Sequence, residues 1–341
     1  MIAVDAMAHL DRCRRPALER RHRATSASGS ALAKEWHHVV VHGPELSLLV
    51  NLSESATSDG PVARTIVMAH DEHHWYTSLT TAAASDVAIA TDRLDAHYGQ
   101  STRLAFDDGA YHLSASDSTE GYDIDLVLRP QSPASMLTGV TLSRTEKLSW
   151  FFVPRLQATG RVTLVGDTTV MTDAPAYHDH NWGRFDWGGD YAWEWISIVA
   201  DDWSVTASRL LNGSRTRVTS QYLHLETAGE AVTFRDHEIE VASHGRQRFD
   251  DAPVVPGVMR LLTPALVEDV PATMRWSARR GAQTLDLRIE PASVARLVMP
   301  SERAVDRVVV LAESLGEAQL TGTINGRDLS GLAPAIVELL R

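Results

Sequence analysis

Short runs in which apolar and polar residues alternate recur along much of the chain. In Tyr122–Leu128, every second position is apolar, with Tyr122, Ile124, Leu126 and Leu128 in this register. A period of two places such side chains on one face of an extended backbone. The run therefore predicts a half-buried antiparallel strand.

Further segments rich in β-branched and apolar residues, separated by Gly, Pro, Asp and Ser, predict more strands. In the first half they are Val39–Val41, Leu46–Leu52, Arg64–Ala69 and Gly160–Val165. In the second half they are Trp193–Ala200, Ser204–Leu211, Arg217–Glu226, Ala231–Phe234, His237–Val241, Thr284–Glu290, Val308–Ser314 and Gln319–Ile324. Asn212-Gly213 and Asn325-Gly326 predict hairpin turns. Only Ala292–Val298 and Leu332–Leu340 are candidates for helices.

Two successive sets of strands predict an all-β protein made of two antiparallel barrels or sandwiches in tandem. The 341 residues are enough for two domains of ordinary size. We expect a flexible or short helical extension over 1–30, a first β domain over 31–185 and a second over 186–341. The strand pattern has no βαβ rhythm, glycine-rich phosphate loop or Gly-x-Ser-x-Gly turn.

The amino-acid composition makes some classes of binding partner less favourable than others. The chain is 44% hydrophobic and 22% charged, with a net charge of −12, as in a soluble globular protein. An acidic surface disfavours nucleic acids and anionic membranes. Cys13 is the single cysteine, so no internal disulfide or cysteine metal site can form. Without an apolar leader or a membrane-spanning run, we expect a cytoplasmic protein with no integral membrane segment.

Candidate chemistry concentrates in residues 176–195, which hold four of the nine tryptophans, two histidines and four acids. If the first part is extended, its side chains divide between two faces. One face would hold His178, His180 and Trp182, and the other Tyr177, Asp179 and Asn181. Gly183, Gly188 and Gly189 are expected to break the run into turns, and Trp193 and Trp195 then alternate with Glu194.

Three interpretations of this segment compete. The polar groups could be hydrogen-bonded structural residues beside core tryptophans. A metal could bind His178 and His180, but the His-x-His spacing is weak evidence without further ligands. The third interpretation is an aromatic pocket with acid and base groups, because indole faces stabilise positive charge and a buried Asp can act as an acid.

The segment also resembles a known family. Phe151–Leu156, Gly160, Val162 and Tyr177–Gly183 are similar to the central signature of the hydroxyneurosporene synthase and AttH-like family. Weaker similarity is carried by Glu35-Trp36-His37-His38, His70–His74, Glu313, Gly322–Gly326 and Glu338-Leu339. The resemblance covers about 35–341 and is strongest between 150 and 195. His37 and His38 replace expected aromatics, and Gly331–Ala335 lacks the usual Gly-x-Gly-Tyr, so no relative's substrate can be carried over.

The resemblance implies paired lipocalin-like domains, a pocket near their junction, and chemistry on large unsaturated apolar molecules without an organic cofactor. Asp179 and His180 are the first candidates for catalysis, followed by His178 and Asn181. The candidate substrate-binding residues are Tyr177, Trp182, Trp193, Glu194, Trp195, Trp36, His38 and His70. No metal is expected.

The leading functional hypothesis is a cyclase that closes a ring in a hydrophobic polyene, by [4+2] cycloaddition or a related reaction, in natural-product biosynthesis. A hydratase that adds water to a carotenoid or other isoprenoid double bond is the alternative within the family. A third hypothesis is a lipocalin-like carrier, which would need the tryptophans but not Asp179 or His180.

Overall fold

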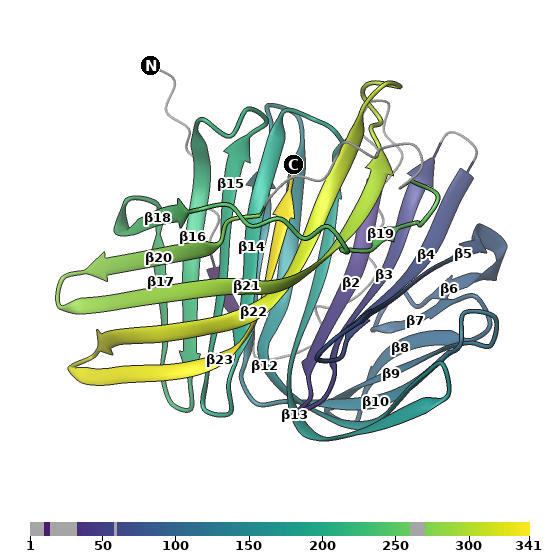
Figure 1. Ribbon diagram of the computed structural model, residues 1–341, viewed down its shortest axis with the longest axis horizontal. Coiled ribbons are helices and arrows are strands. Elements are labelled where there is room, and N and C mark those ends of the chain that lie inside the picture. Colours follow the sequence, from purple (N-terminus) through teal and green to yellow (C-terminus); the bar gives the residue numbers. More distant parts are fainter. Residues whose placement is uncertain (1–9, 14–32, 58–59, 260–269) are drawn as a thin grey trace. The chain divides into compact units, whose positions relative to one another are not determined.

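A computed structural model of the chain describes residues 10–13, 33–57, 60–259 and 270–341 (Figure 1). Strands dominate the described part, with short 3₁₀ turns at η2 (Ala84–Asp86) and η3 (Asp236–Glu238). The all-β prediction is confirmed. The chain divides into two compact units between Asp186 and Trp187, and each unit has its own sheet. The domain bounds and the pocket expected from the family resemblance stay predictions.

The first unit is built on a 13-stranded antiparallel sheet. Its strands are β1 (Leu10–Cys13), β2 (Ala33–His42), β3 (Ser47–Thr57), β4 (Gly60–His70), β5 (Trp75–Ala83), β6 (Val87–Ile89), β7 (Asp95–Tyr98), β8 (Thr102–Asp107), β9 (Ala110–Asp117), β10 (Tyr122–Pro130), β11 (Ala134–Thr141), β12 (Lys147–Leu164) and β13 (Asp167–Arg184). The main order is β5-β4-β3-β2-β13-β12-β10-β9-β8-β7-β6, and β11 links β12 to β1.

This sheet is strongly curled (Figure 1), and its apolar face is on the inside of the curl. β4, near one end of the strand order, contacts β7, near the other end, so the sheet is almost closed. Every second residue of the central strands points inward, as in any barrel. The inner face is represented by Val39, Val50, Leu104, Leu113, Leu126 and Val162, all buried in one core cluster. The alternation predicted for Tyr122–Leu128 is confirmed.

The second unit contains a 10-stranded sheet. Its strands are β14 (Tyr191–Val199), β15 (Trp203–Asn212), β16 (Val218–Thr227), β17 (Ala231–Arg235), β18 (Ile239–His244), β19 (Val254–Val255), β20 (Thr273–Arg280), β21 (Gln283–Pro300), β22 (Val308–Ile324) and β23 (Arg327–Leu340). The order is β17-β16-β15-β14-β23-β22-β21-β20-β18, and β19 pairs parallel with β21. β16 contacts β18 and β17 contacts β20, so this sheet also curls towards closure around an apolar core.

Both helix candidates are wrong. Ala292–Val298 lies within β21, and Leu332–Leu340 lies within β23. Each run is paired on both sides, β21 with β19 and β22, and β23 with β14 and β22. Three consecutive residues of each run are buried, Val294–Arg296 and Ala335–Val337, so the period of two is lost there. Short apolar runs of this kind cannot be separated from helices by periodicity.

The N-terminal extension is only partly described. Leu10–Cys13 forms β1, which pairs with Ala134–Leu137 of β11, so this part is a strand and not the short helix considered from the sequence. The remainder of 1–30 lies outside the described residues. Strand pairing with a distant segment is a tertiary effect that local helical spacing does not report.

The predicted Asn-Gly hairpins are confirmed. Asn325 and Gly326 join β22 to β23, and both have positive φ, at 50° and 77°. This conformation suits a type I′ turn, which glycine adopts without a steric penalty. Asn212 and Gly213 begin the loop between β15 and β16. Within the described residues, no helix is long and apolar enough to cross a membrane.

Candidate functional site

The signature segment occupies β13, which lies between β2 and β12 in the first sheet. Opposite it, Val153 pairs with His178 and Leu156 pairs with Ala176, so Pro154 and Arg155 form a bulge against one residue. A bulge accommodates a proline inside a central strand because one ladder hydrogen bond is already missing. The bulge keeps the apolar residues on both sides of it directed towards the core.

The predicted division of β13 into two faces is confirmed by its register. His178 lies opposite Val39 and Val153, and these two valines belong to the core of the unit. His180 and Trp182 share this inner face, whereas Tyr177, Asp179 and Asn181 share the outer face. All of these side chains except Trp182 are buried, so both faces of the strand are shielded from water.

Gly183 corrects the expectation from the sequence, because it lies inside β13 and not in a turn. A Cβ atom there would lie 2.4 Å from the backbone oxygen of Lys147. Glycine is therefore required by the close approach of β12. Gly188 does lie in a turn, with a positive φ of 86°.

On the inner face, three histidines stack beside a carboxylate; we call Glu35, His37, His178 and His180 the inner cluster. The ring of His37 lies 4.0 Å from that of His180 and 5.7 Å from that of His178, centroid to centroid. His180 Nε2 lies 2.8 Å from Glu35 Oε1. Tyr111 packs against His178 at 4.6 Å between ring centroids. This arrangement orients His180 and provides groups that can exchange protons within an apolar core.

On the outer face, a carboxylate is held by its neighbours on the same strand; we call Tyr177, Asp179, Asn181 and His38 the Asp179 cluster. Tyr177 donates its hydroxyl to Asp179 Oδ2 at 2.9 Å. Asn181 donates its amide to Asp179 Oδ1 at 2.6 Å. His38 lies opposite Asp179 on β2. Both carboxyl oxygens are thus fixed in direction, and Asp179 is 3% exposed.

Burial keeps two histidines of β2 neutral at neutral pH. It lowers the pKa of His38 to about 3, with a smaller contribution from His178, and it lowers the pKa of His42 to about 4. A neutral imidazole can accept as well as donate a hydrogen bond. His42 uses Nδ1 in a 3.2 Å contact with the Ser47 hydroxyl.

These pKa shifts predict that the free energy of unfolding falls as pH drops below about 6.5. In the unfolded chain both histidines bind protons there, whereas in the folded protein they resist protonation. Each histidine should lower the free energy of unfolding by about 1.4 kcal/mol for every unit by which the pH falls, until the pH reaches the pKa of that histidine in the folded protein. Urea unfolding at several pH values measures this slope. His42→Phe should reduce the slope, whereas replacement of the exposed His112 by Gln is the control; equal slopes in His42→Phe and wild type would contradict the assignment.

The structure brings some predicted residues to these clusters and places others elsewhere. Trp36 lies opposite Asn181, on the outer face, with its ring 6.1 Å from that of Phe185. His70 ends β4 and packs against Trp75. Two strands, β2 and β3, separate β4 from β13, and the register places His70 level with Ser47 and His42, so it lies outside the Asp179 cluster.

The remaining predicted residues lie on β14 of the second unit. Trp193 donates its indole N–H to Glu338, and Trp195 lies opposite Glu338 on β23. Glu194 points to the other face, where it accepts a 2.9 Å hydrogen bond from Arg209. The three consecutive residues therefore do not share one surface.

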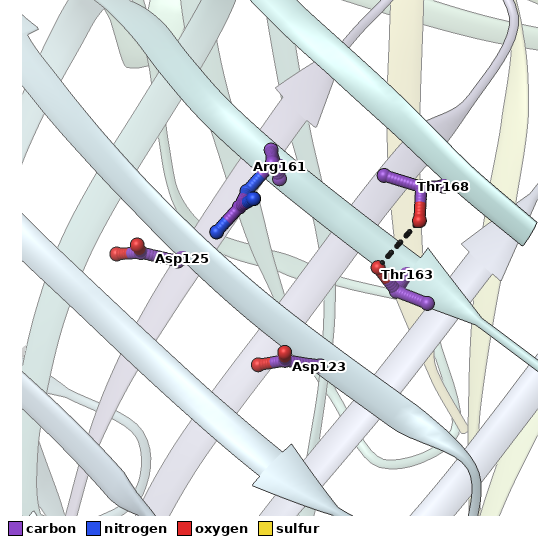
Figure 2. A pocket seen from close by; sticks show the side chains of 5 residues that line it. All are labelled: Asp123, Asp125, Arg161, Thr163 and Thr168. Atoms are coloured by element: carbon purple, nitrogen blue, oxygen red, sulfur yellow. Dashed lines mark hydrogen bonds between the residues drawn. The ribbon is translucent and has the colours of Figure 1, made fainter. Parts of the chain in front are cut away.

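Two surface features of the first unit offer no comparable chemistry. A shallow depression of about 120 Å³ lies on the outer face of β10, β12 and β13 (Figure 2). It is lined by Asp123, Asp125, Arg161, Thr163 and Thr168, of which four are exposed and Thr163 is partly exposed. Its lining has no aromatic or apolar wall for a hydrophobic ligand.

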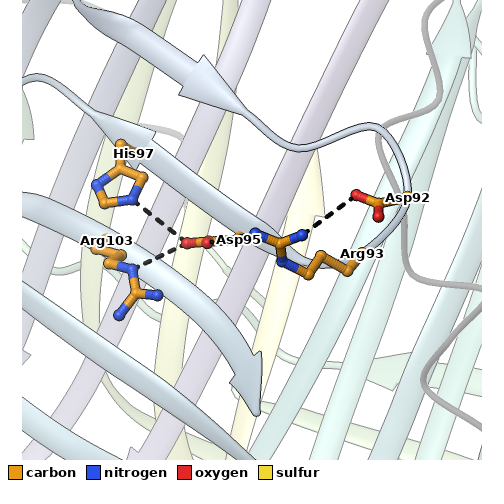
Figure 3. A network of polar contacts seen from close by, with 5 residues as sticks. All are labelled: Asp92, Arg93, Asp95, His97 and Arg103. Atoms are coloured by element: carbon orange, nitrogen blue, oxygen red, sulfur yellow. Dashed lines mark hydrogen bonds and ion pairs between the residues drawn. The ribbon is translucent and has the colours of Figure 1, made fainter.

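The second surface feature is an ion network around Asp95 (Figure 3). Arg103 Nε lies 2.9 Å from Asp95 Oδ1, and His97 Nε2 lies 3.3 Å from the same oxygen. The pKa of Asp95 is lowered, and the main cause is the hydrogen bond that Arg103 donates to it. The network joins β7 to β8 and fits a structural role in this hairpin.

Metal ligation is one of the interpretations of His178 and His180. Among the residues that the structure describes, no three His, Cys, Asp or Glu side chains are grouped so that they could hold a metal ion. His180 faces Glu35 and His37. These contacts suit the exchange of protons between neighbouring side chains.

The sequence alone does not identify all members of the two clusters. It marks Glu35 and His37 only as part of an early motif, and it does not single out Tyr111. Their contacts join β2, β9 and β13, which are far apart in sequence. The alternation of Glu35 and His37 puts them on one face, but only strand pairing shows which face of β13 they meet.

Comparison with known proteins gives a fold but no close relative. No protein-family model matches the sequence, and no curated protein matches it. Among solved structures, the AttH-type protein NE1406 of Nitrosomonas europaea is similar at a TM-score of 0.67 and 15% identity, over 96% of each chain.

Two further solved structures share the architecture. Kievitone hydratase of Nectria haematococca has a TM-score of 0.59 at 11% identity, over 90% of this chain and 88% of that one. CghA in complex with Sch210972 has a TM-score of 0.53 at 10% identity, over 92% of this chain and 89% of that one. These structural neighbours agree with the resemblance carried by the signature segment. The chain therefore has the AttH-like, lipocalin-like fold over almost its whole length.

Proposed function

We propose that the protein is a cofactor-independent enzyme that closes a ring within a hydrophobic polyene of natural-product biosynthesis. The observation that carries the proposal is the Asp179 cluster, a buried carboxylate whose two oxygens are fixed by Tyr177 and Asn181. Its support is a fold shared with kievitone hydratase and with CghA, which binds Sch210972. The resemblance of β13 to the family signature supports it further.

Ring formation by [4+2] cycloaddition requires the side chains mainly to position the substrate. Two new σ bonds replace two π bonds, and no atom is gained or lost. Holding the reacting ends near contact distance can lower the barrier by roughly 7–11 kcal/mol in favourable cases. Asp179 would orient a hydroxyl or N–H of the substrate, and Trp36 on the same face would support its apolar part. His180 and Glu35 would provide a proton where the reaction needs one.

Hydration is the second candidate because kievitone hydratase has the same fold. In this reaction an acid transfers a proton to the alkene, water attacks the resulting cation, and the proton lost by that water returns to the base. His180, oriented by Glu35, could hold such a water. A carrier remains the non-catalytic alternative, in which the clusters serve only structure.

Identification of a bound molecule would test these functions. The purified protein is incubated with an extract of its producer cells, repurified, denatured and extracted for liquid chromatography with mass spectrometry, which separates isomers of equal mass; a parallel incubation uses oxygen-18 water. A precursor converted to an isomer of unchanged mass is the expected result. A product carrying labelled oxygen would favour hydration, and a ligand released unchanged would favour a carrier. If the folded protein retains no apolar molecule, the proposal is wrong.

A further inference from the structure

A row of buried polar side chains crosses five neighbouring strands of the second unit, β16, β15, β14, β23 and β22. Cross-strand pairs connect it: Thr206 lies opposite both His224 and Ser197, and Glu338 lies opposite both Trp195 and Glu313. We call this set, which also includes Ser204, the polar row. Residues in register on neighbouring strands point to the same face of a sheet.

The polar row faces away from the core of its own unit. The alternate residues on the same strands, such as Ile196, Val205 and Leu223, form that core. The row is nevertheless shielded from solvent, with Thr206 0% and Glu313 3% exposed. Buried polar groups in this number need partners, since each unsatisfied group costs about 1–3 kcal/mol.

At one end of the row, two glutamates form a hydrogen-bonded pair. Glu338 bonds to Glu313 and also accepts the indole N–H of Trp193. Burial raises the pKa of Glu338. A hydrogen bond between two carboxyl groups requires a proton on one of them, as in other carboxyl pairs. The shared proton lets the two carboxyl groups lie together without a second negative charge.

The middle of the row holds hydroxyl groups that have no hydrogen-bond partner among the described residues. These are Ser197 Oγ, Ser204 Oγ and Thr206 Oγ1, on side chains that are at most 1% exposed. Ser197 lies two positions from Trp195 on β14 and so shares the face of Glu338. Each hydroxyl can donate one hydrogen bond and accept others.

We propose that the polar row binds the carbonyl oxygen of an otherwise apolar ligand whose chain packs on Trp193 and Trp195. This inference rests on the proposed function and narrows its substrate class to an oxygenated polyene instead of a hydrocarbon. A carbonyl accepts the hydrogen bonds that the three hydroxyls can donate. The two indoles on the same face provide the apolar surface.

The test compares two small linear polyenes. Pseudoionone carries a conjugated ketone, and alloocimene is a hydrocarbon; binding of each is followed by quenching of tryptophan fluorescence. Wild type should bind the ketone about tenfold more tightly than the hydrocarbon. A variant combining Ser197→Ala and Thr206→Val should bind the ketone at least about fivefold more weakly than wild type, with hydrocarbon binding unchanged.

The variants separate binding from folding. Removing hydroxyls that have no partner should leave stability equal or higher in urea unfolding. Ser314→Ala is the matched control, because this serine is also buried and without a described partner but lies opposite Val337 of the core. Two results would overturn this inference alone. One is equal binding of both polyenes by wild type; the other is a loss of ketone binding in Ser314→Ala as large as that in the double variant. If the folded protein binds neither polyene, the inference and the proposed function both fail.

Discussion

Asp179→Asn is expected to reduce kcat on the identified polyene by about 10²-fold, the loss that misplacement of a bound substrate can cause. In the native protein the two oxygens of Asp179 accept hydrogen bonds from Tyr177 and Asn181. The substituted amide places an N–H₂ group against one of these donors. The cluster must then rearrange, while the shape of the side chain is nearly conserved.

Steady-state kinetics together with ligand retention measure this effect. We expect the variant to retain the polyene, because Trp36 is unchanged, so the loss should fall on kcat more than on KM. Asp186→Asn is a suitable control, since Asp186 is another buried aspartate of the first unit and lies outside both clusters. Turnover by Asp179→Asn within about twofold of wild type would remove Asp179 from the mechanism.

The sequence predicted the local features of the fold well. Alternation in Tyr122–Leu128 and the Asn325-Gly326 turn depend on residues close in the chain, and both were confirmed. The same principle placed His178 and His180 on one face of a strand, with Asp179 on the other. Such features follow from a backbone period that the residues themselves reveal.

Long-range pairing explains what could not be predicted. Leu332–Leu340 is an apolar run that a helix or a buried strand could equally contain, and its pairing with β14 and β22 decides the matter. Likewise, Glu35 reaches His180 across 145 residues of sequence. A single sequence does not show which strands pair with each other. The residues that make up each cluster can therefore be identified only from the order of strands in the sheet.

The largest effect on stability is expected from Gly160→Ala in β12. Gly160 has φ of 146°, a region that L side chains rarely adopt. A Cβ atom would lie 2.0 Å from the carbonyl oxygen of Asp125 in β10. Because this oxygen belongs to the backbone, it cannot move away by a rotamer change as a flexible side chain would. Strain and overpacking together should lower the free energy of unfolding by about 4 kcal/mol.

Gly166→Ala separates the two causes. Gly166 also has a positive φ, 97°, but no atom lies within 4 Å of the position that a Cβ would take, so only the backbone strain of about 1 kcal/mol applies. Urea unfolding of both variants measures the difference. Because β12 pairs with β10 on one side and β13 on the other, displacement at Gly160 should also disturb the signature strand. Equal losses in the two variants would mean that the backbone of β10 shifts to make room for the new methyl group, and would contradict the steric clash expected at Gly160.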